Sequence, residues 1–120
     1  MIRRRIPGAC DLYWIDPNPI AGREMRDRHR FVIITQKQIN ALGVAMAVPV
    51  TSGDAFARNM GLTVAVSGHD TVGVAVRNQV RSFDIKARER NGSARFVETL
   101  DAHTTAEIVA RVVSVIDPDE

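Results

Sequence analysis

Two hydroxyl residues, Thr51 and Ser52, stand where an apolar segment gives way to polar sequence. The apolar run 44–48 leads through Pro49 into a Thr-Ser-Gly turn, and Phe56 and Arg58 follow shortly after it. Hydroxyls and a guanidinium can bind a phosphate, and an aromatic ring can stack on a base. An ordinary strand end with Ser/Thr turn chemistry has the same composition. Both interpretations remain open for this segment.

A second group of candidate residues lies in the loop 22–30. It contains four arginines and one histidine, namely Arg23, Arg26, Arg28, Arg30 and His29. The planar guanidinium binds phosphate oxygens bidentately, and an imidazole can act as acid or base near neutral pH. A solvated loop whose charge is partly neutralised by Glu24 and Asp27 is the alternative.

A third polar group, Arg77, Asn78 and Gln79, follows the apolar residues 73–76. Amides can donate and accept hydrogen bonds, and a guanidinium can hold a phosphate. Turn-capping amides and an ordinary surface ion pair would explain the same residues.

The charge of the chain is distributed unevenly. Residues 1–97 carry 15 Lys/Arg and 8 Asp/Glu, a net charge of +7, whereas residues 98–120 carry one Arg and six acids, a net charge of −5. This asymmetry fits a site for a polyanion on the main body of the protein. An acidic, solvated rim on the last helix fits equally well.

The length of 120 residues predicts a single domain over 1–120. Cys10 is the only cysteine, and His29, His69 and His103 are too scattered for a zinc site, so no metal or cofactor is expected. The arginines at positions 3–5 are not followed by an apolar segment, and no apolar run approaches the ~20 residues that span a bilayer. We therefore expect a cytoplasmic protein.

The elements that must position these residues are short strands followed by one helix. The sequence predicts strands over 11–16, 31–35, 44–50, 62–66 and from 73 onward, with one or two helical turns over 36–42. Residues 84–88 are interpreted as a short turn, and Asn91-Gly92 as a hairpin turn. Apolar residues at helical spacing after Thr104 predict a C-terminal helix that ends at Pro118. The whole pattern favours a small barrel or sheet covered by that helix.

Five segments in this order resemble the MazF/PemK (Kid/ChpB) family of toxin endoribonucleases, from about Gly8 to Ile116. The resemblance implies an SH3-like barrel that forms a homodimer and cleaves single-stranded mRNA without a metal. It also implies a cyclic phosphate product and a cognate antitoxin with an acidic C-terminal tail. The segments are Asp11-Leu-Tyr-Trp-Ile-Asp16, Phe31-Val-Ile-Ile-Thr35, Val48-Pro-Val-Thr-Ser-Gly53 with Phe56-Ala-Arg58, Asn78-Gln-Val-Arg81 and Asp84-Ile-Lys-Ala-Arg88.

The resemblance implies roles for individual residues. Thr51 with His29 or Arg30 would carry the chemistry, and the remaining candidates would bind RNA. His29 stands where the family has an Arg before Pro, although a shift of one residue would place Arg28 or Arg30 there. The RNA-binding residues would be Arg23, Arg28, Ser52, Phe56, Arg58, Arg77, Asn78 and Gln79.

The chain departs from the Kid branch at its acid/base trio. Arg23, Val76 and Asn78 stand where that branch has His, Arg and Asp. Two alternatives therefore stay open. One is a toxin that binds DNA gyrase, as CcdB-like proteins on a similar barrel do. The other is an inactive relative that only binds RNA or an antitoxin.

Overall fold

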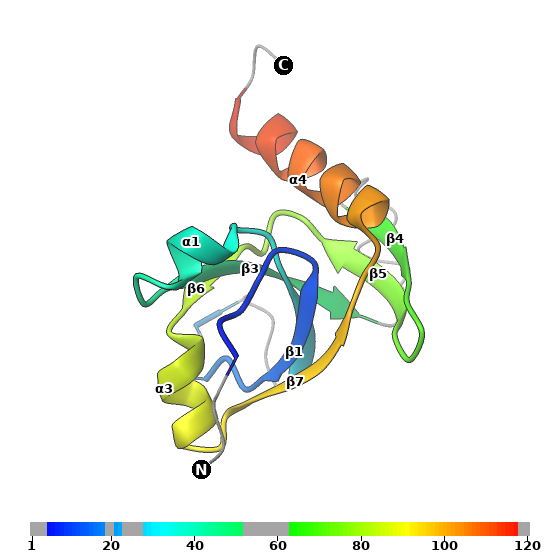
Figure 1. The fold of residues 1–120 in the computed structure, drawn as a ribbon. Helices are drawn as coiled ribbons and strands as arrows, with labels where there is room; N and C mark the ends of the chain where they lie inside the picture. The colour runs from blue at the N-terminus through cyan, green and yellow to red at the C-terminus, as the bar shows by residue number, and fades with distance from the viewer. Residues whose placement is uncertain (1–4, 19–20, 23–27, 52–62, 118–120) are drawn as a thin grey trace.

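Seven strands form one antiparallel sheet with helices at its margins in the computed structural model (Figure 1). The structure describes residues 5–18, 21–22, 28–51 and 63–117. Its elements are β1 (Asp11–Ile15), β2 (His29–Ile33), α1 (Lys37–Asn40), β3 (Ala45–Thr51), β4 (Thr63–Ser67), β5 (Val72–Val76), β6 (Arg81–Phe83), α3 (Ile85–Arg90), β7 (Ala94–Thr99) and α4 (Ala102–Ile116).

The strands follow one another in the order β4-β5-β3-β2-β1-β7, and β6 pairs with the start of β3. β3 is the central element, because it pairs with β2 along most of its length, with β5 at Val50–Thr51 and with β6 at 45–47. The two outer strands, β4 and β7, do not pair with each other within the described part of the chain. The predicted mostly-β class with a C-terminal helix is confirmed, but the curled sheet is not closed and is a barrel only in a loose sense.

The sheet separates two apolar cores, because successive residues of a strand point to opposite faces. In β1, Leu12 belongs to the core beneath α4, whereas Tyr13 and Ile15 belong to the core enclosed by the curl of the sheet. Phe31 and Phe83 meet edge-to-face in this second core, with ring centroids 5.0 Å apart. Both faces of the sheet are therefore apolar over most of its area.

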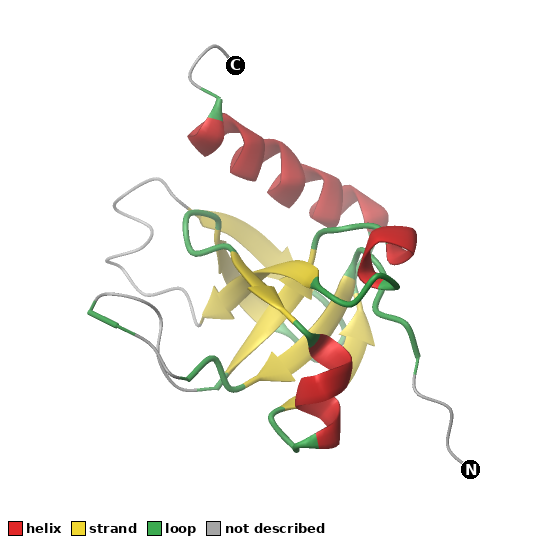
Figure 2. Cartoon of the chain, turned by 90° about the vertical axis from the view of Figure 1, so that its left-hand side faces the viewer, coloured by secondary structure: helices red, strands yellow, loops and turns green. Residues whose placement is uncertain are grey.

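The helix α4 lies across one side of the sheet (Figure 2). Its N-cap is Asp101, whose carboxylate accepts a hydrogen bond from the backbone N–H of Thr104, so the helix begins slightly before the predicted Thr104. Ile108 and Val112 are buried against the sheet, whereas Ile116 at the far end is 70% exposed. The predicted apolar stripe is thus only partly covered within the described residues.

Two sequence-based interpretations near residue 90 are wrong. The predicted short turn at 84–88 is the beginning of α3, which Asp84 caps through its side chain. Asn91-Gly92 ends this helix, with Gly92 in the left-handed region at φ +83°, and does not turn a hairpin. The chain then enters β7, a strand that the sequence did not indicate.

β7 pairs with β1 and so brings the first and the last strand of the described sheet together. The hydroxyl of Thr99 donates to the buried Asp11 carboxylate at 2.9 Å, across 88 residues of sequence. The same carboxylate accepts from the backbone N–H of Gly8 and from the Arg5 guanidinium. These bonds fasten the segment that precedes β1.

Among the described residues, no helix combines the length and the apolar character that crossing a membrane requires.

Candidate active site

A cleft of about 410 Å³ lies at the adjoining ends of β2 and β3. We call it the Thr51 cleft. It brings together Thr51 with the described part of the arginine-dense loop, two groups that are more than 20 residues apart in sequence. Its lining residues are Trp14, Arg28, His29, Arg30, Val50, Thr51, Thr71 and Val72.

The register of β2 and β3 decides which of the candidate residues face each other. Arg30 lies opposite Val50, and the next step of the same antiparallel register places His29 opposite Thr51. Directly opposed residues have their Cβ atoms about 5 Å apart on one face of a sheet. Because neighbours along a strand alternate, Arg30 lies instead on the face of Val50 and Trp14. By extension of this register Thr51 faces the position of His29 rather than that of Arg30, although all three residues line the cleft.

The Arg30 guanidinium is held in place by the turn between β4 and β5. Its Nη1 donates to the backbone oxygen of Asp70 and, at 2.8 Å, to the hydroxyl of Thr71. Its carbon Cζ lies 5.3 Å from the centre of the Trp14 ring. Arg30 thus forms part of the cleft wall in a fixed position.

Glu98 on β7 holds the same turn from the other side. Its carboxylate accepts from the Thr71 hydroxyl at 2.7 Å and from the backbone N–H groups of His69 and Asp70 at 2.7 and 2.8 Å. Partial burial favours the neutral acid, but these hydrogen bonds and the Arg30 charge outweigh it and lower the pKa of Glu98 below its usual 4.5. A continuous chain of polar contacts therefore runs from Glu98 through Thr71 to Arg30.

Of the remaining predicted residues that the structure describes, Arg28 alone lines this cleft. It is exposed at the entrance of β2. Arg77, Asn78 and Gln79 follow the end of β5 and are not among the residues that line this cleft. The expectation that β5 continues through Arg77 is wrong, since the strand ends at Val76.

Four predicted RNA-binding residues fall outside the described residues. They are Arg23, Ser52, Phe56 and Arg58.

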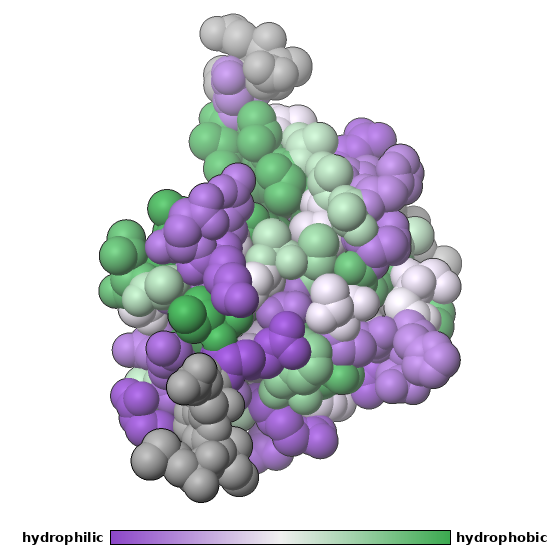
Figure 3. All heavy atoms as spheres, in the orientation of Figure 1, coloured by the Kyte–Doolittle hydropathy of each residue, from purple (hydrophilic) through white to green (hydrophobic). Residues whose placement is uncertain are grey.

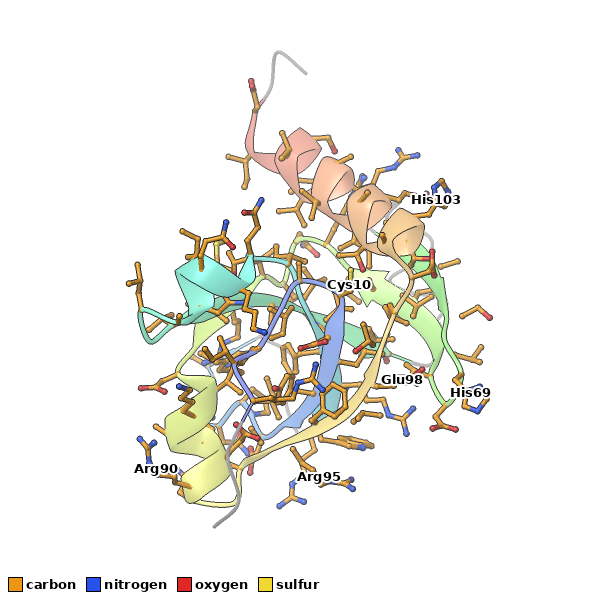
Figure 4. All side chains as sticks on the ribbon, viewed as in Figure 1. Cys10, His69, Arg90, Arg95, Glu98 and His103 are labelled. Atoms are coloured by element: carbon orange, nitrogen blue, oxygen red, sulfur yellow. The ribbon has the colours of Figure 1, made fainter. Side chains whose placement is uncertain are left out.

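The sequence missed two residues that form walls of clefts. Tyr13 is buried in the core, whereas Trp14, its neighbour on β1, is half-buried and lines the Thr51 cleft. Trp14 also lines a second cleft of about 400 Å³ together with Arg28, Gly92, Ser93, Ala94 and Arg95, which we call the Arg95 cleft. Figure 4 shows Arg95 projecting outward from β7, and His69 and His103 at the surface. Strand alternation could have revealed Arg95, had β7 been predicted.

Comparison with known proteins agrees with this geometry. Residues 9–116 match the family described as PemK-like, MazF-like toxin of type II toxin-antitoxin system. The chain therefore belongs to this family of toxins, and the resemblance noted in the sequence is confirmed.

Relatives with similar sequences or structures bear names from the same family. The endoribonuclease PemK of Escherichia coli is 33% identical over 93 residues, which cover 75% of this chain and 70% of PemK. A crystal structure of MazF from Deinococcus radiodurans superposes with a TM-score of 0.80 at 25% identity and covers 94% of this chain and 98% of that one. A MazE-MazF crystal structure from the same organism has a TM-score of 0.74 at 25% identity and covers 94% and 97%.

Proposed function

We propose that this toxin is a sequence-specific endoribonuclease that cleaves single-stranded mRNA without a metal ion and thereby arrests growth. The observation that carries the proposal is the Thr51 cleft, in which a hydroxyl, an imidazole and two guanidiniums meet. Those are the groups that phosphodiester cleavage requires when no metal supplies the charge. The related PemK is named an endoribonuclease.

The cleavage is a transfer of the phosphodiester to the neighbouring ribose 2′-hydroxyl. The 2′-oxygen attacks phosphorus after losing its proton to a base, and the bond from phosphorus to the 5′-oxygen breaks as that oxygen gains a proton. The products are a 2′,3′-cyclic phosphate and a free 5′-hydroxyl. The enzyme must move two protons and stabilise the added negative charge of the phosphorane.

Each group in the cleft has a position that suits one of these tasks. The Thr51 hydroxyl donates to a non-bridging phosphate oxygen, and His29, opposite it on β2, transfers a proton. Arg28 reaches the phosphate from the exposed rim. Arg30, which is held by Thr71 and Asp70, adds positive charge on the Trp14 side of the cleft. The imidazole therefore takes the place of the arginine found at that position in the family.

A cleavage assay with three variants tests this assignment. Purified protein is incubated with a long RNA in the presence of EDTA, alongside Thr51→Ala, Thr51→Ser and His29→Ala. We expect the wild type to cleave, the Thr51→Ser variant to keep much of the rate, and each alanine variant to lose about 10²-fold or more. Circular dichroism of each variant shows that the fold is intact.

The outcomes separate the proposal from its alternatives. Equal cleavage by the wild type and both alanine variants would indicate a contaminating nuclease. Salt-sensitive RNA binding without cleavage would identify an inactive relative. Inhibition of DNA gyrase without RNA cleavage would identify a gyrase-binding toxin.

The proposed partners are a second copy of the chain and an antitoxin with an acidic C-terminal tail. Apolar side chains that a monomer leaves exposed support the homodimer, among them Leu42 near α1, at 84% exposure, and Ile116 on α4. Figure 3 shows this apolar surface over α4 and at the α1 end of the molecule. Light scattering should give twice the chain mass of 13.2 kDa, and a monomer at all concentrations would contradict the dimer.

The net charge of +7 on residues 1–97 supports an acidic antitoxin tail, and a MazF of similar structure crystallised with MazE. We further propose that residues 1–120 act as one domain in the cytoplasm, where mRNA is found. Co-expression with the product of the adjacent gene, followed by copurification, tests the pairing.

A further inference from the structure

The Arg95 cleft lies directly beside the proposed cleavage site and, apart from Arg28, is built from residues to which the sequence assigned no role. It shares Trp14 and Arg28 with the Thr51 cleft, so the two clefts adjoin along one wall. A polynucleotide chain that occupies one of them can therefore continue into the other. Its volume of about 400 Å³ falls in the range of small-ligand sites.

The pairing of three strands explains why cations flank an aromatic ring here. Trp14 on β1 lies opposite Arg30 on β2 and opposite Arg95 on β7. The three side chains form one row across one face of the sheet, with the two arginines about 10 Å apart at the spacing of neighbouring strands. An aromatic ring between cations is the arrangement that binds single-stranded nucleic acid, because bases stack and phosphates pair.

The charge of the described cleft lining indicates the class of ligand. Arg28 and Arg95 are both exposed, and none of the six lining residues that the structure describes is acidic. Arg30 does not line this cleft, so Trp14 presents a surface here that the Arg30 guanidinium does not cover. The Ser93 hydroxyl is already engaged with Asn91 and contributes little to a ligand. What remains is one ring and two guanidiniums.

We infer that the Arg95 cleft binds the RNA nucleotide next to the scissile phosphate, with its base stacked on Trp14 and its phosphate held by Arg95 and Arg28. This inference rests on the proposed nuclease function and adds a specificity subsite to it. Arg95 binds substrate away from the reacting atoms, so its loss acts mainly on KM rather than on kcat.

A matched pair of arginine variants tests the subsite. Arg95→Ala and Arg90→Ala remove the same charge, but Arg90 is exposed on α3 and lines neither cleft, as its position in Figure 4 indicates. Oligoribonucleotides spanning a mapped cut site are shortened one nucleotide at a time from each end, and kcat and KM are measured for each.

The expected result has two parts. Arg95→Ala should raise KM about tenfold on the full oligonucleotide and leave kcat within about twofold, as loss of one phosphate contact worth about 1.4 kcal/mol requires. Removal of the neighbouring nucleotide should raise the KM of Arg95→Ala less than it raises the KM of the wild type and of Arg90→Ala, because only the contacts with Trp14 and Arg28 remain to be lost. Arg95→Lys should recover part of the loss, because the charge is kept.

Binding measured without cleavage separates this inference from the proposed function. Trp14 is the only tryptophan, so quenching of its fluorescence measures the binding of RNA. The ligand is an oligonucleotide with a 2′-deoxy substitution at the cut site, which cannot be cleaved. If the protein cleaves no RNA, any single-stranded RNA serves instead. The slope of log K against log salt should fall by about 0.7 in Arg95→Ala and stay unchanged in Arg90→Ala. Quenching with this difference in salt slope, in a protein that cleaves no RNA, would support the subsite and contradict the proposed nuclease function. Equal KM values and salt slopes in the two variants, or no quenching, would overturn the subsite.

Discussion

Glu98 should hold the β4–β5 turn against β7, and its removal should cost a measurable part of the stability of the fold. The change to alanine deletes three hydrogen bonds to a carboxylate, from the Thr71 hydroxyl and from the backbone N–H groups of His69 and Asp70. Hydrogen bonds to charged groups contribute about 1.5–3 kcal/mol each when buried. Two of these three are exposed, so we take about 1 kcal/mol each and expect a loss of about 3 kcal/mol.

The assays are urea unfolding, which gives the free energy of unfolding, and thermal unfolding, both followed by the fluorescence of Trp14, which lies beside the turn in the wall of the Thr51 cleft. A loss of about 3 kcal/mol should lower the melting temperature by roughly 12 °C in a domain of this size. Glu98→Gln keeps the shape and some acceptor capacity, and should lose about half as much. Glu107→Ala removes an exposed acid from α4 and is the matched control.

The dependence on pH gives a second, independent test. Because the pKa of Glu98 is lowered on folding, its carboxylate stabilises the fold above the unfolded pKa of about 4.5, and this contribution is lost as the pH falls through the lowered folded value. The difference in stability between the wild type and Glu98→Gln should therefore shrink between pH 7 and pH 3. If Glu98→Ala stays within about 0.5 kcal/mol of Glu107→Ala, the contacts do not stabilise the turn, and the reasoning is refuted.

Three further changes should have distinct effects. The hydroxyl of Tyr13 is buried without a hydrogen-bond partner in the described part of the chain, and its burial raises the pKa of this group. In a urea titration, Tyr13→Phe should therefore leave the free energy of unfolding unchanged or raise it by up to about 1 kcal/mol. A clear loss of stability would contradict this. A Cβ on Gly73 would overlap the backbone oxygen of Thr51, so Gly73→Ala should destabilise the fold by roughly 1–3 kcal/mol and slow RNA cleavage. Gly8→Ala is the control, because a Cβ there meets only ordinary contacts, and it should have neither effect. Asp101→Ala removes the N-cap of α4 and should speed hydrogen exchange in its first turn without changing the exchange of the sheet.

Much of the strand pattern could be predicted because the central strands are buried on both faces. The segment from Phe31 to Ile33 is fully buried, and so are Ala47 to Val50, which makes each a continuous apolar run. β7 escaped prediction because it is an edge strand with charged residues at Arg95 and Glu98. Its neighbour α3 escaped because only one of its six residues is buried, so no apolar periodicity marks it.

The candidate site was predictable in its residue types but not in its geometry. Thr51 and the arginine-dense loop stood out by chemistry, whereas the choice between His29 and Arg30 needed the pairing of β2 with β3. Trp14 could not be assigned from sequence, because both faces of β1 lead to apolar cores and alternation does not show which positions reach a cleft. Glu98 reaches its partners only through the curl of the sheet, which no local pattern encodes.

The pairing of β1 with β7 also governs when the protein can finish folding. A newly made chain displays the free edge of β1 until residues 94–99 have left the ribosome, because that edge has no other partner in the described sheet. Contacts between such distant residues form slowly, and an open strand edge invites association with other chains in the meantime. Products of translation that stop before residue 94 should therefore be prone to aggregation, and the row of Arg95, Trp14 and Arg30 should assemble only after β7 has emerged from the ribosome.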